Sequence, residues 1–422
     1  MSRWKKFLHI SKESLEVAII SCGDTGMEIG IGIIKNLQVH DVKVKSLLIT
    51  TELVDEKSQK NFELTVSIPG SKDGYAKRLD VATKDIKNSS DEIKEKLEKL
   101  LGKSFEGLLF VATGSGGTGL GATTVVLEIL AKEFNLKPPV ITLLPEVFEN
   151  SRVQYNAAEF IYQIAFKKRA PKNPIIILDN KPRIRELDLP FSEVSKKRLE
   201  IIPTALADLL IASFKDSITE EFDANVSDLF DVIHSQGISV FVSETIGGES
   251  GDLDNLRIED VISESVIDTT SLNKDAVFEA ERAFISIFNL EQPGGKLDFA
   301  TRFETNKLFK EFRNTRPHVK FVSDETGEAK LRAIIAGLPL PTRILQIMRI
   351  ARDSRKRIIV EENMLDYTEI RIDEDEIFQL EDSLQAVFDP YEEELPPKIK
   401  VSVKKESKSE KSKKNASTKN AD

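Results

Sequence analysis

The chain has a single cysteine, Cys22, among its 422 residues, so it cannot form an internal disulfide. This shortage is typical of proteins kept in a reducing cytoplasm. The four histidines are scattered, with no spacing that suggests a metal site. No apolar run reaches the roughly 18 to 20 residues that cross a bilayer, and the first residues lack the apolar core of a signal peptide. We therefore expect a cytoplasmic protein without a zinc centre.

Positive charge is outnumbered by negative charge, and the distribution of charge is uneven. The formal net charge is −10, and residues 361–394 are densely acidic with Arg371 as the only basic side chain. An acidic body argues against nucleic-acid binding, which depends mainly on neutralising phosphates. Residues 398–422 hold nine lysines and almost no apolar side chains after Val403, which predicts a disordered tail. This tail either keeps the chain soluble or contacts an adaptor or an acidic membrane surface.

Short apolar runs alternate with helical segments through the first half of the chain. Residues 15–22, 44–52, 106–113, 138–145 and 173–180 have the composition of buried strands. Such alternation predicts an α/β fold with a parallel sheet covered on both faces. In the helical segment at 89–102, Ser89 and Glu92 have the spacing of a capping box. A long helix is expected at 198–218, and a second, smaller set of strands and helices follows it.

These patterns predict six consecutive regions along the chain. They are an N-terminal extension at 1–14, a nucleotide-binding domain at 15–198, a central helix and loop at 199–240, a second α+β domain at 241–341, an acidic extension at 342–397, and the lysine-rich tail at 398–422.

Five of the chain's 21 glycines fall within residues 114–121, directly after an expected strand and before an expected helix. Such glycines allow a phosphate group to approach the backbone closely. A P-loop is excluded because no lysine follows the last glycine. A Rossmann fingerprint is met by Gly114, Gly116 and Gly119, with Glu146 as a late acidic partner. That match falls after a substantial αβ region, whereas a Rossmann fingerprint usually lies in the first strand–helix turn.

A third pattern accounts for more of the chain. Residues 115–121 read Ser-Gly-Gly-Thr-Gly-Leu-Gly, which resembles the signature of the tubulin/FtsZ superfamily except for Leu120. Five further segments resemble that superfamily in the right order over about residues 15–240. They are residues 23–30, which resemble the first phosphate loop of tubulins; residues 49–52; Pro145 with Phe148 and Glu149; Leu178 with Asp179 and Asn180; and residues 223–237.

The resemblance implies a cytoplasmic GTP-binding protein that assembles head to tail into cytoskeletal or division filaments. Phosphate loops would hold GTP, and Mg²⁺ could accompany it. The catalytic loop of one subunit would complete the site of the next and allow GTP hydrolysis there. The implied nucleotide-binding residues are Gly23, Asp24, Thr25, Gly26, Glu28, Ser115, Gly116, Gly117, Thr118, Gly119, Glu149, Arg152 and Asn180, and the implied catalytic residues are Asp223, Asn225 and Asp228.

Several departures from the family pattern bear on catalysis. Asp223 and Asn225 exchange the acid and the amide of the FtsZ loop, whereas Asp228 is retained. Residues 69–80 replace the glycine-rich loop that senses the γ-phosphate, and Glu28 adds negative charge near the phosphates. These differences are typical of a divergent, archaeal FtsZ-like protein. Two alternatives stay open, a GTP-binding scaffold that does not hydrolyse GTP and a Rossmann-type NAD-dependent oxidoreductase.

Each implied site residue also has a plain structural explanation. Glu149 could be a solvated carboxylate, and Asn180 could cap a helix or form a turn. Asp223 and Asp228 could be surface charges favoured by a helix dipole. Cys22 is expected to be a small core residue and not a nucleophile.

Overall fold

A computed structural model describes residues 16–52, 54–69, 75, 79–102, 105–145, 149–167, 172–178, 191–246, 257–289, 299–324 and 326–363. These residues all fall within one compact unit, Met1–Glu374. Among them, no helix combines the length and the apolarity that a membrane span requires.

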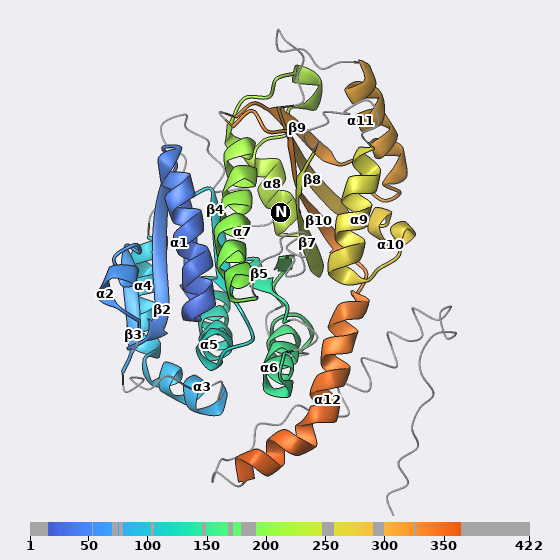
Figure 1. Ribbon diagram of the computed structural model, residues 1–422. Helices are drawn as coiled ribbons and strands as arrows, with labels where there is room; N and C mark the ends of the chain where they lie inside the picture. The colour runs from blue at the N-terminus through green and yellow to red at the C-terminus, as the bar shows by residue number, and fades with distance from the viewer. Residues whose placement is uncertain are drawn as a thin grey trace, which may run out of the picture. The chain divides into compact units, whose positions relative to one another are not determined.

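The described strands form one ten-stranded sheet in the order β3-β2-β1-β4-β5-β6-β7-β10-β8-β9 (Figure 1). Their bounds are β1 Glu16–Cys22, β2 Lys43–Thr51, β3 Leu64–Ile68, β4 Gly107–Ala112, β5 Val140–Leu143, β6 Ile175–Leu178, β7 Ile238–Thr245, β8 Arg282–Phe288, β9 His318–Val322 and β10 Lys330–Leu338. Neighbouring strands from β3 to β7 are parallel, and only β10 runs against its neighbours β7 and β8. The predicted α/β class with a largely parallel sheet is confirmed.

Helices cover both faces of this sheet. Their bounds are α1 Gly23–Val39, α2 Glu56–Gln59, α3 Leu79–Asn88, α4 Ser90–Leu101, α5 Gly117–Glu133, α6 Ser151–Ile161, α7 Phe191–Phe214, α8 Val226–Ile233, α9 Ile258–Thr270, α10 Lys274–Phe278, α11 Phe299–Glu311 and α12 Thr342–Asn363. A π-helical turn, Tyr162–Phe166, extends α6. Helices α1, α7 and α8 share one apolar core with alternate residues of the parallel strands, such as Val17 and Ile19 of β1. The buried residues of α5 do not belong to that core, because right-handed crossovers in opposite directions put α1 and α5 on opposite faces.

The strand order creates a crevice at one edge of the sheet. From β1 the chain crosses to β2 on one side, whereas from β4 it crosses to β5 on the other side. The carboxyl ends of β1 and β4 therefore lie at a topological switch point, where ligands of open α/β sheets bind.

The structure differs from the sequence-based expectations in three places. The predicted capping box of Ser89 is wrong, because α3 leads directly into α4 and the Ser89 hydroxyl donates to the carbonyl of Asp85. Strand β3 was not expected, and it pairs with β2 at the edge of the sheet. The segment expected to be an acidic extension begins with α12, which packs along α6. The predicted domain boundaries stay a prediction, and β7 spans the boundary expected after residue 240.

Candidate functional site

The loops that follow β1 and β4 touch each other at the switch point. Cys22 and Ala112 are paired across the two strands, so both loops leave the sheet at the same level. Gly23 has a φ of +72°, and a Cβ atom there would lie 2.9 Å from the backbone nitrogen of Gly119. Glycine is therefore required at position 23 both by the left-handed backbone and by the close contact.

Two helices begin at this contact, and both are 17 residues long. Their N-cap residues, Cys22 of α1 and Gly116 of α5, make no side-chain hydrogen bond to the first turn. The N–H groups of a first helical turn have no partner within the helix, and the helix dipole makes this end positive. Two uncapped N-termini at one crevice form a binding site suited to an anion with several phosphate groups.

The glycine loop, residues 114–121, is tightly packed on one side and open on the other. A Cβ atom at Gly119 would lie 2.3 Å from the Thr113 carbonyl oxygen, and one at Gly114 would lie 2.4 Å from the Cβ of Phe160. A Cβ atom at Gly116 would meet nothing within 4 Å. A ligand can therefore approach the backbone at Gly116, while the glycines on either side hold the loop in shape. Gly117 follows directly as the buried first residue of α5.

Other predicted contacts lie on the same two loops. Gly26 packs against β4, where a Cβ atom would lie 2.8 Å from the Val111 carbonyl oxygen. Three hydroxyl side chains are partly exposed here and can donate to an anion, namely Thr25, Ser115 and Thr118. The predicted phosphate-binding residues are thus brought together, although their role stays a prediction.

Negative charge also faces this site. Asp24 and Glu28 are exposed on the first two turns of α1. Desolvation raises the pKa of the Glu28 carboxyl, and the charge of Asp24 raises it further. Asp24 is favoured by the helix dipole, but both carboxylates repel an incoming phosphate. The two carboxylates therefore make the crevice less positive than its backbone geometry alone would.

Helix α6 forms a wall beside the glycine loop, with Phe160 packed against Gly114. Glu149 lies partly exposed just before this helix, and Arg152 lies in its first turn. Phe160 lies near the other end of α6, so this contact does not bring Glu149 or Arg152 to the glycine loop, and their predicted ribose contacts stay a prediction. Glu146, Phe148 and Asn180 lie outside the described residues, so the predicted guanine contact stays a prediction.

The predicted catalytic residues form the start of α8. Asn225 is the N-cap and accepts hydrogen bonds from the backbone N–H groups of Ser227 and Asp228 at 2.8 and 3.3 Å. In return, the Asp228 carboxylate accepts one from the Asn225 N–H at 2.8 Å. This reciprocal pair is a capping box, so Asn225 and Asp228 have a structural role whether or not they act in catalysis.

Strand β9 holds this loop from the side. The Nζ atom of Lys320 lies 3.7 Å from Asp223 Oδ1, and His318 Nδ1 lies 3.6 Å from Asp228 Oδ1. The Lys320 side chain is only 2% exposed, whereas that of Asp223 is 63% exposed. Burial lowers the pKa of Lys320, and the nearby Asp223 carboxylate opposes that shift. The loop is therefore pinned to β9 while the Asp223 carboxylate still faces solvent.

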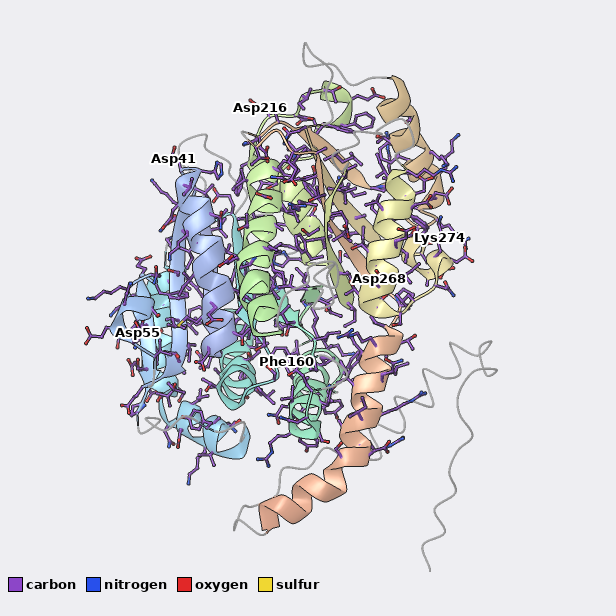
Figure 2. All side chains as sticks on the ribbon, in the orientation of Figure 1. Asp41, Asp55, Phe160, Asp216, Asp268 and Lys274 are labelled. Atoms are coloured by element: carbon purple, nitrogen blue, oxygen red, sulfur yellow. The ribbon has the colours of Figure 1, made fainter. Side chains whose placement is uncertain are left out.

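The glycine loop and the loop of residues 223–228 lie far apart, near opposite ends of α7. Helices α1 and α7 run in the same direction, since Gly32 packs against Pro203 and the Asn36 amide donates to Thr204. The 24 residues of α7 span about 36 Å at 1.5 Å per residue. Figure 2 shows Asp216, just after α7, near the top of the view and Phe160, beside the glycine loop, well below it. One chain therefore cannot bring Asp228 to its own glycine loop.

Sequence reasoning missed several residues of these sites. Phe160, Lys320 and His318 contact the two loops from segments far away in the sequence, and no local pattern marks them. Cys22 is buried as expected, and burial raises the pKa of its thiol. Within the described ranges, no three histidine, cysteine or carboxylate side chains gather closely enough to hold a metal ion.

Comparison with known proteins finds the same architecture elsewhere, although no family model matches the chain. The cell division protein FtsZ of Porphyromonas gingivalis is 27% identical over 225 residues, which are 53% of this chain and 45% of that protein. The match thus spans less than half the length of that relative.

Solved structures match over a larger share of the chain. The CetZ2 protofilament from Haloferax volcanii, bound to GTPγS, has a TM-score of 0.65 at 18% identity and covers 82% of this chain and 100% of its own. An empty FtsZ dimer from M. jannaschii has a TM-score of 0.57 at 18% identity and covers 80% and 93%. These likenesses confirm the fold.

Proposed function

We propose that the chain is a member of the tubulin/FtsZ superfamily, that it binds GTP, and that it assembles head to tail into filaments that hydrolyse GTP between subunits. One observation carries the proposal: two uncapped helix N-termini meet at the switch point, beside a glycine loop that is open at Gly116. The arrangement suits a chain of phosphates. The analogy for the ligand comes from CetZ2, whose structure is a GTPγS-bound protofilament. The analogy for assembly comes from that protofilament and from the FtsZ dimer.

In this proposal, the loops that follow the strands bind different parts of the nucleotide. The backbone N–H groups of residues 116–119 and the start of α1 hold the phosphates, while Glu149 accepts hydrogen bonds from the ribose hydroxyls. Asn180 would recognise the guanine edge. Mg²⁺, if it accompanies GTP, would be bound mainly by phosphate oxygens and water, since the described residues offer no ready-made cluster of ligands. It would offset the negative charge of Asp24 and Glu28.

Hydrolysis in this proposal takes place where two copies meet. The glycine loop and the loop carrying Asp223 and Asp228 lie near opposite ends of α7, so stacking copies in one direction brings them together. Such a head-to-tail contact does not close and continues into a filament. Asp223 is the more exposed carboxylate, and Asp228 would orient the attacking water while it also caps α8. The role in cell division or cell shape is part of the same proposal.

Two alternatives remain, a scaffold that binds GTP without hydrolysing it and a dinucleotide-binding oxidoreductase, and the second has weaker support. A GTP-binding scaffold without hydrolysis is favoured by the structural use of Asp228, whose carboxylate already accepts a hydrogen bond within its own chain. The strand order β3-β2-β1-β4-β5-β6 also occurs in dinucleotide-binding proteins. In those proteins, however, the glycine fingerprint follows the first strand, whereas the glycine loop here follows β4.

The test is GTP turnover per subunit as a function of protein concentration, together with sedimentation of filaments. For the wild type, turnover per subunit should rise with concentration because each site needs two chains. Asp228→Asn can still accept the Asn225 hydrogen bond, so it should keep α8 and GTP binding but lose hydrolysis. The matched control is Asp231→Ala, an exposed carboxylate on the same helix, which should behave like the wild type.

Mixing experiments make the shared site visible. Asp228→Asn subunits added to wild type should lower turnover by more than dilution does, because each mutant loop disables the site of a neighbour. Turnover per subunit that is constant with concentration, and equal in wild type and Asp228→Asn, would contradict hydrolysis between subunits. GTP binding without turnover in either protein would instead support the scaffold.

A further inference from the structure

A histidine at the start of β9 faces the carboxylate of Asp228. The Nδ1 atom of His318 lies 3.6 Å from Asp228 Oδ1. The other oxygen of the same carboxylate, Oδ2, accepts the hydrogen bond from the Asn225 N–H that completes the cap of α8. The capping box therefore uses one oxygen of Asp228, and the second oxygen is directed at the imidazole.

His318 lies at the edge of the sheet opposite to the glycine loop. Because β10 runs against both β7 and β8, strands β7, β8 and β9 have the same direction as β1 and β4. The glycine loop follows the carboxyl end of β4, whereas His318 is the first residue of β9. The His318 side chain is 42% exposed and that of Asp228 is 29% exposed. A ligand carried by a neighbouring subunit can therefore reach this pair.

The backbone keeps the two side chains together. The loop before α8 runs along β9, where Asp223 forms a β-bridge with Lys320. The N–H of Ala224 donates to the carbonyl of Val319 at 3.4 Å, and the N–H of Ile218 donates to the carbonyl of Phe321 at 2.9 Å. These contacts attach the loop to the strand that carries His318, so the separation of His318 and Asp228 does not depend on their side chains alone.

A carboxylate beside one nitrogen of an imidazole prepares the other nitrogen to act as a base. A neutral imidazole has one N–H donor and one acceptor nitrogen. Asp228 favours the form with the proton on Nδ1, which leaves Nε2 as the acceptor, as in an Asp–His pair that activates a hydroxyl nucleophile. The elements around His318 carry these other charged side chains: Asp231 on α8, Asp223 on the loop, Lys320 on β9 and Arg282 on β8. Asp223 and Lys320 pair with each other, and Arg282 donates to the Asp231 carbonyl.

We propose that His318 is a catalytic residue of the reaction between subunits, in which its Nε2 accepts a proton from the water that attacks the neighbour's γ-phosphate. This inference rests on the proposed function. The water oxygen forms a bond to the γ-phosphorus, and the bond from that phosphorus to the oxygen bridging it to the β-phosphate breaks, which releases GDP. The proton moves to Nε2 and then to solvent. Asp228 orients the water through the imidazole, which accepts a proton near neutral pH better than a carboxylate does.

The test is the pH dependence of GTP turnover from pH 8 to pH 5.5. Sedimentation at each pH refers the rate to assembled protein. Wild-type turnover should fall about tenfold per pH unit at the acid end, because a protonated imidazole cannot accept a proton. His318→Gln still forms hydrogen bonds but is no base, so its turnover at pH 8 should be at least about 100-fold lower and should not depend on pH in this way. Its GTP affinity should match that of the wild type, because the nucleotide is bound by the other chain.

His40→Gln is the matched control. His40 is an exposed histidine at the C-terminal end of α1, the end far from the glycine loop. This variant should keep the turnover and the pH dependence of the wild type.

Three results would overturn the role of His318. They are wild-type turnover in His318→Gln, a lower turnover that keeps the wild-type pH dependence, and, if His318→Gln does not fold, an unchanged pH dependence in His318→Asn. The second result would leave His318 only a structural contact of the loop. A wild type that binds GTP without turnover would contradict hydrolysis between subunits, and this role with it. That outcome is distinct from the other three, in which the wild type is active.

Discussion

Replacing Gly116 by alanine should separate the fold from nucleotide binding. Gly116 has φ −103° and ψ 158°, which any residue adopts, and the added methyl group would meet nothing within 4 Å. Alanine restricts the unfolded chain and so stabilises by about 0.4 to 1 kcal/mol. It is also a poorer N-cap than glycine, which costs a similar amount. The free energy of unfolding should therefore change by less than about 0.5 kcal/mol.

The effect on binding should be much larger. The methyl group projects into the open space at the start of α5, where the proposed phosphates approach the backbone. Losing even one hydrogen bond to a charged phosphate costs at least about 1.5 kcal/mol, which corresponds to more than tenfold in affinity. Isothermal titration with GTP and urea denaturation of the same sample measure both quantities.

A second glycine provides the contrast. Gly119→Ala would put a methyl group 2.3 Å from a backbone oxygen of Thr113, so it should destabilise the folded chain even without ligand. If Gly116→Ala is folded and binds GTP as tightly as the wild type, the glycine loop is not the phosphate site. If Gly116→Ala unfolds, the packing described for this loop is wrong.

Three further predictions concern stability and the tail. Burial alone would raise the pKa of Asp324, but hydrogen bonds from Thr326, Asn289 and Lys330 lower it to about 2. Because the folded pKa is below the unfolded one, about 2 kcal/mol of stability should be present above pH 4 and lost as the pH falls to 2. Urea denaturation of Asp324→Asn at several pH values should show less of this dependence. Asp228→Ala removes one half of the capping box and should cost about 1 kcal/mol, whereas Asp228→Asn should cost less; equal stability in thermal melts of all three proteins would contradict the cap. Deleting residues 404–422 should change neither stability nor GTP binding, because this lysine-rich segment has almost no apolar side chains to bury, and a loss of GTP affinity would show that the segment belongs to the site.

The strands could be predicted well because they are buried on both faces. Residues 108–112 form an unbroken apolar run, and β4 contains all of it. Edge strand β3 has the mixed sequence Leu-Thr-Val-Ser-Ile and is only partly buried, so its composition does not stand out. The Ser89 prediction failed because a capping pattern requires an extended N-cap, whereas the backbone at Ser89 continues from α3.

The site was predictable only where it is local in sequence. The sequence pattern of residues 114–121 predicts the glycine loop, and Asn225 and Asp228 indicate the start of α8. The contacts that hold these loops in place are long-range. Lys320 contacts a side chain about 100 positions away, and Arg343 contacts a backbone carbonyl 198 positions away. A single sequence carries no signal for such pairs. The archaeal origin and the domain boundaries stay predictions.

The central claim is tested most directly by equilibrium binding of GTP and of NAD to the wild-type protein, under the same conditions and without filaments. The two-helix crevice and its glycine loop after β4 predict saturable binding of GTP at one site per chain and no measurable binding of NAD. Saturable binding of NAD with no binding of GTP would contradict the account and restore the dinucleotide-binding alternative.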